Sequence, residues 1–158
     1  MLSVGLDMVK KNIKIGMAVL KPGIGEKQEE NAIQYLDSLQ EIHTDVFVVA
    51  VTTMLELPLV TQELLAKGCD AVLVFGSCPL IDLRPVYEKH LIQISLRTQK
   101  PILNGLFFGK TAPSNYEKQG SILAEESLAL MNLLKDLKQI KKIRVSSTKK
   151  KKKKLFKK

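Results

Sequence analysis

Apolar residues follow two alternating patterns along the chain. Four short runs are apolar almost throughout, which predicts buried strands. These runs are residues 13–19 (IKIGMAV), 44–51 (TDVFVVAV), 70–76 (DAVLVFG) and 100–108 (KPILNGLFF). Strands that are apolar throughout, instead of alternating with polar residues, are typical of parallel sheets covered on both faces.

The segments between these runs have the spacing of amphipathic helices. Helices are predicted over residues 29–40, about 57–67, about 83–98 and 114 to about 137. The residues expected to face inward in the first three helices are Ala32, Ile33, Leu36 and Leu39; Val60, Leu64 and Leu65; and Leu83, Val86, His90, Leu91 and Ile94.

Three local signals mark helix boundaries. Pro58 is tolerated in the first turn of the second helix, and Gly68 is placed to end it. The sequence SNYE, Ser114 to Glu117, has the spacing of a capping box. The Ser114 hydroxyl and the Glu117 carboxylate are therefore expected to accept hydrogen bonds from free amides at the start of the last helix.

Strands that alternate with helices require right-handed crossovers between parallel strands. The pattern therefore predicts a doubly wound, three-layer α/β/α sandwich around a four-stranded parallel sheet. A chain of 158 residues with 45% apolar residues is large enough for one domain with a substantial core. Open sheets of this kind bind ligands at the carboxyl ends of their strands, so the loops after residues 51 and 76 are candidate sites.

The positive charge is concentrated at the end of the chain. The formal net charge is +9, yet the first 140 residues hold 14 basic and 16 acidic side chains. Residues 141–158 hold eleven Lys or Arg and no acidic residue, and 149–154 are six consecutive lysines. Because like charges repel and bury nothing, we expect a domain over 1–140 and a disordered basic tail over 141–158. This tail is either a solvated extension or a weak binder of polyanions.

Cysteine usage and hydropathy restrict the class of protein further. Cys69 and Cys78 flank one predicted strand. Two cysteines are too few for a disulfide framework, and their spacing is unlike that of a metal-ligand pair, so reduced thiols are expected. No apolar run reaches the roughly 20 residues of a membrane span, and the N-terminus lacks a signal-peptide pattern. These features predict a cytoplasmic protein without a metal site.

Three stretches together resemble the lumazine synthase family. VTTMLELPLVTQELLAKGCDAVLVFG is similar to that family's central helix and the strand before its active-site loop. ISLRTQKPILNGLFFGKT and YEKQGSILAEESLALMNLL are similar to its Pro-initiated strand and last helix. The resemblance is collinear over roughly residues 13–137, and it implies a flavodoxin-like sheet.

The resemblance implies a specific reaction without a metal or a cofactor. Lumazine synthases condense 5-amino-6-(D-ribitylamino)uracil with 3,4-dihydroxy-2-butanone 4-phosphate, mainly through positioning and proton transfer. Pro22 occupies the position of the family's stacking aromatic residue. The turn that binds the uracil and the ribityl hydroxyls corresponds to Thr53, Met54, Leu55 and Glu56, and Glu56 matches the family's residue.

The loop after Gly76 departs from the family. It is about six residues shorter when it is aligned from the helix end, and it contains neither the family's Gly-x-Thr phosphate cradle nor its proton-transferring His. His90 is instead expected inside a helix, partly buried. The backbone amides of Ser77 and Cys78, together with Arg84 near the next helix start, form a substitute anion site in this reading. Cys78 is also a candidate nucleophile, and the alternative is that its thiol is buried and structural.

Two later family positions are altered. Lys118 corresponds approximately to the basic residue that pairs with the substrate phosphate, although it is not bidentate; the alternative is an ordinary exposed helix residue. Asn104 replaces the aromatic residue expected after the Pro-initiated strand. No catalytic residue is assigned.

Two other functions remain open beside lumazine synthesis. Archaeal-type riboflavin synthases share the fold and have a shorter loop. A non-catalytic member of the fold is the other alternative, retained for assembly and carrying a polyanion-binding tail. The resemblance implies a homo-oligomer in each case, a pentamer or an icosahedral shell. The third and fourth helices are expected on one side of the domain, with an apolar face buried between copies.

Overall fold

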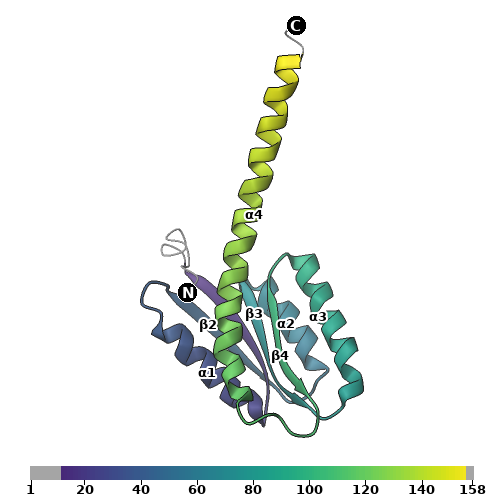
Figure 1. Cartoon of the computed structure of the whole chain (residues 1–158). Helices are drawn as coiled ribbons and strands as arrows, with labels where there is room; N and C mark the ends of the chain where they lie inside the picture. Colours follow the sequence, from purple (N-terminus) through teal and green to yellow (C-terminus); the bar gives the residue numbers. More distant parts are fainter. Residues whose placement is uncertain (1–11, 156–158) are drawn as a thin grey trace.

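The computed structural model describes residues 12–155, and the side chains of residues 12–138. The chain forms one four-stranded parallel sheet with strand order β2-β1-β3-β4, shown with its helices in Figure 1. The elements are β1 (Ile13–Leu20), α1 (Ile24–Ser38), β2 (Thr44–Val51), α2 (Glu56–Ala66), β3 (Ala71–Cys78), η2 (Ile81–Leu83), α3 (Arg84–Thr98), β4 (Ile102–Phe108), η3 (Tyr116–Lys118) and α4 (Gln119–Leu155).

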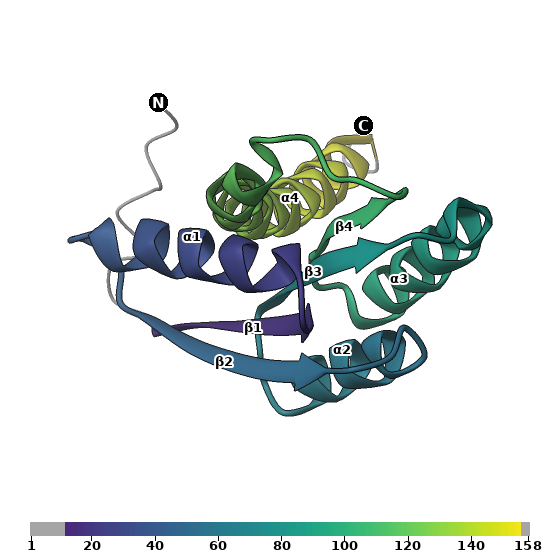
Figure 2. The same ribbon diagram turned by 90° about the horizontal axis from the view of Figure 1, so that it is seen from below.

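The sheet lies between two helical layers. Figure 2 shows α1 and α4 on one face and α2 and α3 on the other. The expectation that the third and fourth helices lie on one side is therefore wrong, because the sheet separates α3 from α4. Each face has its own apolar core cluster, in which strand residues pack against residues of α2 and α3 on one face and against residues of α1 and α4 on the other. The structure therefore confirms the predicted three-layer α/β/α sandwich with a flavodoxin-like parallel sheet.

The central strands and the edge strand differ in burial. All β3 residues from Ala71 to Gly76 are buried, whereas Phe47, Val48 and Val49 of β2 are exposed. The prediction that every apolar run is covered on both faces is wrong for β2. The physical reason is its position, because β2 pairs only with β1 and its outer edge has no neighbouring strand in the described chain.

The buried face of α3 is rotated from the predicted one. Val86 and His90, both expected to face inward, are exposed. Leu91 and Ile94 are buried as predicted, and Tyr87 is buried with them. The Tyr87 ring lies against Phe108 of β4, with 6.4 Å between the ring centroids. The larger aromatic side chain thus takes the core position.

The buried face of α1 is also rotated, and the helix begins earlier than predicted. It starts at Ile24, and its buried positions include Gln28, Ala32 and Leu36, which recur at every fourth residue. Ile33 lies at the exposed border of this face, so its prediction as an inward residue is wrong.

The start of α4 is built differently from the predicted capping box. Residues 116–118 form the short 3-10 helix η3, which has no side-chain cap, and Ser114 is exposed. The amide of Ser121, in the first turn of α4, instead donates a 2.8 Å hydrogen bond to Oδ1 of Asn31 in α1. The cap therefore comes from a neighbouring helix, which no local sequence signal indicates.

The last helix extends beyond its predicted end near Leu137 and continues to Leu155. Lysine is a good helix former, so the backbone of the basic segment is compatible with this continuation. The side chains from residue 139 onward lie outside the described residues. The predicted boundary near residue 140 and the disordered basic tail stay predictions.

Candidate functional site

The strand order places a candidate site at the carboxyl end of the sheet. From β1 the chain crosses to β2 on one side, whereas from β3 it crosses to β4 on the other. Ligands of doubly wound sheets bind in the crevice where the order reverses, here between the carboxyl ends of β1 and β3. The loops at this end follow Leu20, Val51, Cys78 and Phe108.

Neighbouring loops at this end are joined through their backbones. The Lys21 amide donates a 2.9 Å hydrogen bond to the Val51 carbonyl, which links the loops after β1 and β2. The Gly109 amide donates one of 2.9 Å to the Cys78 carbonyl, which links the loops after β3 and β4. A Cβ added at Gly23 would lie 3.8 Å from Ser77 Oγ, so the loops after β1 and β3 also approach.

The turn after β2 is held by its own carboxylate. The Thr52 amide donates a 3.2 Å hydrogen bond to Oε2 of Glu56, the first residue of α2. Thr53 and Leu55 are exposed, Glu56 is half-buried, and Met54 packs against the core. The structure thus brings the predicted turn 53–56 to the same edge as Pro22 and Ser77, with the Glu56 carboxylate fixed in orientation.

The loop after β3 presents its backbone more than its thiol. Cys78 is 3% exposed and belongs to the core beside α3, and its Sγ lies 4.0 Å from the Leu80 carbonyl oxygen. A thiol in this position does not face a ligand at the loop surface, which favours the structural reading of Cys78. The Ser77 side chain is half-buried beside the loop after β1.

Arg84 and Lys118 supply positive charge near this edge. Arg84 Nε donates a 2.9 Å hydrogen bond to Glu88 Oε1, and this bond raises the pKa of Arg84. Arg84 also acts electrostatically on Tyr116, whose pKa is raised by burial and lowered in part by the guanidinium. Tyr116 and the exposed Lys118 both belong to η3, so the two predicted phosphate ligands flank one region.

Asn104 does not lie in a loop. It occupies the third position of β4, paired with Val74, and its Oδ1 accepts a 3.1 Å hydrogen bond from the Leu106 amide. The resemblance relates Asn104 to an aromatic residue that follows the strand in the family, whereas in this chain Asn104 lies within β4 and within the predicted run 100–108.

Gln28 and Gly76 are two supporting residues that the sequence analysis did not identify. The fully buried Gln28 accepts a 3.0 Å hydrogen bond from the Gly76 amide and donates one of 2.8 Å to the Gly105 carbonyl. Gly76 has a φ of 143°, which favours glycine. The recurrence of Gln28, Ala32 and Leu36 at every fourth position was the available signal for Gln28.

Neither histidine of the chain reaches the carboxyl end. His43 precedes β2 at the opposite end of the sheet and lies 3.5 Å from Asp45. His90 is exposed in the middle of α3. The expectation of a partly buried His90 is therefore wrong, and an imidazole at the carboxyl end is lacking.

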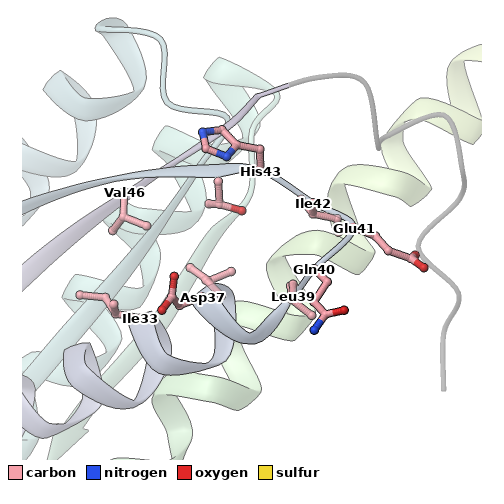
Figure 3. Close-up of a pocket in the computed structure, with 10 residues that line it drawn as sticks. Ile33, Asp37, Leu39, Gln40, Glu41, Ile42, His43 and Val46 are labelled. Atoms are coloured by element: carbon pink, nitrogen blue, oxygen red, sulfur yellow. The ribbon is translucent and has the colours of Figure 1, made fainter.

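A cavity of about 510 Å³ lies at the amino end instead. Figure 3 shows it between the end of α1 and the start of β2. The lining residues are Ile33, Leu36, Asp37, Leu39, Gln40, Glu41, Ile42, His43, Thr44 and Val46. They include two carboxylates and no Lys or Arg, so this cavity is a poor match for a phosphorylated substrate.

Neither a metal-ligand cluster nor a membrane-spanning helix is found among the described residues. The residues that the structure describes contain no group of three or more His, Cys, Asp or Glu side chains arranged to hold a metal ion. Cys69 and Cys78 are both free and buried, as expected for reduced thiols. Within the described part of the chain, no helix is both long and apolar enough to cross a membrane.

Comparison with known proteins finds a relative that matches part of the chain. The chain is 35% identical over 66 residues to a protein of Bdellovibrio bacteriovorus (strain ATCC 15356 / DSM 50701 / NCIMB 9529 / HD100) named 6,7-dimethyl-8-ribityllumazine synthase. The match covers 40% of this chain and 36% of that protein, so it spans about a third of the relative's length. No protein-family model matches the chain.

Proposed function

We propose that this protein is a 6,7-dimethyl-8-ribityllumazine synthase, which condenses 5-amino-6-(D-ribitylamino)uracil with 3,4-dihydroxy-2-butanone 4-phosphate in riboflavin biosynthesis. The observation that carries the proposal is the turn 53–56, which resembles the family's substrate-binding turn and lies at the carboxyl end of the sheet. The name of the partial relative supports the same transferase activity.

In this proposal, Glu56 accepts hydrogen bonds from the ribityl hydroxyls. A carboxylate with its second oxygen free is suited to this role, because hydrogen bonds to an ionised acceptor are stronger than neutral ones. The amide of Thr52 already holds Oε2. The backbone of residues 53–55 then contacts the uracil. Pro22 bounds the site without offering an aromatic surface for stacking.

The butanone phosphate is proposed to lie between the β3 loop and η3. The amides of Ser77 and Cys78 and the side chains of Arg84 and Lys118 supply donors and positive charge. Arg84 now pairs with Glu88, so phosphate binding competes with that pair. Asn104 is proposed to act from within β4, through its bond to Leu106. The proposed reaction uses no metal and no cofactor.

A non-catalytic role is the second candidate, and the placement of both histidines favours it. Proton transfer in the family relies on an imidazole that this edge lacks, because His43 and His90 lie elsewhere. The fold then serves oligomer formation, with the basic tail binding a polyanion. An archaeal-type riboflavin synthase remains a further alternative within the same fold.

Turnover of purified protein distinguishes these candidates. We expect lumazine fluorescence to appear when both family substrates are supplied, and to fall with Glu56→Gln but not with Glu63→Gln, an exposed control on the same helix. Formation of riboflavin from supplied lumazine would instead identify a riboflavin synthase. Binding of ribitylamino-uracil without either product would identify the non-catalytic member.

The oligomer is proposed to form through the α2–α3 layer, as a pentamer or a shell. Leu59, Ile92 and Leu96 are exposed on these helices, and burying them between copies would remove apolar surface from water. Light scattering at micromolar concentration should give a ring-sized mass. A monomer would contradict the proposal.

The basic tail is proposed to bind polyanions independently of the site. Each phosphate that its side chains neutralise steepens the salt dependence by nearly one unit of log–log slope. Truncation after Ile140 should abolish retention on heparin and leave binding of small molecules unchanged. Unchanged retention would place the basic surface elsewhere.

A further inference from the structure

One side of α4 carries an apolar stripe that the rest of the described chain leaves uncovered. Ile122, Leu130, Leu133 and Leu137 are 45%, 38%, 52% and 50% exposed. The last three have the i, i+3, i+7 spacing of a helix-packing seam. The buried residues of the same helix, Leu123, Ala124, Ser127 and Leu128, face the sheet and α1 on the opposite side.

The helix also leaves the body of the molecule. Figure 1 shows that α4 crosses the sheet with its first turns and then projects away from it. The stripe spans residues 122–137, which is about 22 Å at 1.5 Å per residue. A second helix can therefore lie along the stripe without displacing α1 or the sheet.

Charge is distributed unevenly along this helix. Glu125 and Glu126 are exposed near its start. In the sequence, Lys138, Lys141, Lys142 and Arg144 follow the stripe with no acidic residue among positions 137–144. A parallel pair of such helices would place like charges together and bring two basic tails side by side, which is unfavourable. An antiparallel pair places the acidic start of each helix beside the basic part of the other.

We propose that α4 is a docking surface for α4 of a second copy of this chain, in antiparallel orientation about a twofold axis near Leu133. This register places Leu130 of each copy opposite Leu137 of the other. It also places Glu125 and Glu126 opposite positions 142 and 141, which are lysines in the sequence. The apolar seam and the charge pattern thus select the same register.

The surface is distinct from the α2–α3 layer, which lies on the other face of the sheet (Figure 2). A helix pair through α4 joins two chains, or two rings of chains, whether or not a ring forms. The proposal therefore stands independently of the proposed activity.

Single cysteines in the full-length protein test both the pairing and its direction. The native Cys69 and Cys78 are buried and will not interfere under native conditions. A mixture of Leu130→Cys and Leu137→Cys protein should form a mixed disulfide at least tenfold faster than either variant forms one with itself. Self-linking of Leu137→Cys at the faster rate would indicate a parallel pair and overturn the proposal.

Mass measurement provides the second test. Leu130→Glu with Leu133→Glu places like charges in the seam and should reduce the mass of the assembly to half or less. The melting temperature of the dissociated chain should stay within about 4 °C of that of the unaltered protein. The control change, Ile92→Glu with Leu96→Glu on the proposed ring surface of α3, is made in the Leu130→Cys and Leu137→Cys proteins. This control should still form the mixed disulfide, whatever its effect on the mass. An unchanged mass of the α4 variant together with no mixed disulfide would show that another molecule, or only solvent, covers the stripe.

Discussion

The two ends of the sheet differ in shape and in chemistry. The amino end has a cavity whose titratable lining residues are Asp37, Glu41 and His43. The carboxyl end has four loops that backbone hydrogen bonds join in two pairs, with Arg84 and Lys118 near them. A hollow therefore does not by itself locate the ligand site in this chain, because the groups that suit phosphates and hydroxyls lie at the other end.

The two ends also differ in how well their polar groups are satisfied. At the carboxyl end, Gln28 uses both ends of its amide to join Gly76 and Gly105. At the amino end, the buried hydroxyl of Thr44 has no hydrogen-bond partner among the residues that the structure describes. We infer that the carboxyl end is held in one arrangement and that substitutions there cost more free energy of unfolding.

The largest effect is expected for Gly76→Ala. Alanine is strained at a φ of 143°, and its Cβ would lie 2.6 Å from Leu20 Cβ. Strain and overpacking together should lower the free energy of unfolding by about 3 kcal/mol, measured by urea denaturation. Gly68→Ala is the control, because Gly68 has a φ of 102° but no atom within 4 Å of the added Cβ. Equal losses would show that the close approach to Leu20 contributes nothing.

Gln28→Leu should lower the free energy of unfolding by about 2 kcal/mol. Leucine leaves the Gly76 amide and the Gly105 carbonyl without the side-chain partner, and each buried polar group that loses its partner costs about 1–3 kcal/mol. The same change at the exposed Gln34 of α1 should have no measurable effect. Unfolding of both variants at the same urea concentration would show that the Gln28 side-chain amide does not stabilise the carboxyl end.

Glu56→Gln should weaken binding of ribitylamino-uracil about tenfold, or about 1.4 kcal/mol, because a charged acceptor is replaced by a neutral one. Glutamine keeps an oxygen for the Thr52 amide, so the free energy of unfolding should hardly change. Isothermal titration measures the affinity, with Glu63→Gln as the exposed control. An affinity equal to that of the unaltered protein would remove Glu56 from the site.

The smallest effect is expected at the amino end. Thr44→Val removes a buried hydroxyl that has no partner in the described part of the chain. The change should raise the free energy of unfolding by about 0.5–1 kcal/mol, without changing ligand affinity. Thr61→Val, at a second unpartnered hydroxyl in α2, should behave similarly. A loss of stability for Thr44→Val alone would indicate that the cavity holds a partner for that hydroxyl.

The succession of strands and helices along the chain could be predicted from the sequence because their periodicities are strong. The run 44–51 coincides with β2, and Gly68, with its φ of 102°, follows the end of α2 as predicted. The burial of β2 was mispredicted because an apolar run does not distinguish an edge strand from a central one. That distinction depends on the strand order, which is a property of the whole fold.

The candidate site was less accessible to sequence reasoning. The turn 53–56 could be located because it follows a strand and precedes a helix. Tyr116 was assigned only to a capping box, whereas its hydroxyl donates a 3.3 Å hydrogen bond to the Leu106 carbonyl across the fold. Asn31 accepts a hydrogen bond from a residue 90 positions away in the sequence, and Gln28 accepts one from a residue 48 positions away. Such contacts leave only the helical spacing as a local signal.

We expect a ligand to bind the carboxyl end of the sheet and not the cavity at the amino end. Hydrogen exchange with and without ribitylamino-uracil tests it most directly, because backbone amides report both ends in one experiment. We expect slower exchange at residues 21–23, 52–56 and 77–80, and no change at residues 37–46. Slower exchange confined to residues 37–46, or no change anywhere at saturating ligand, would contradict it.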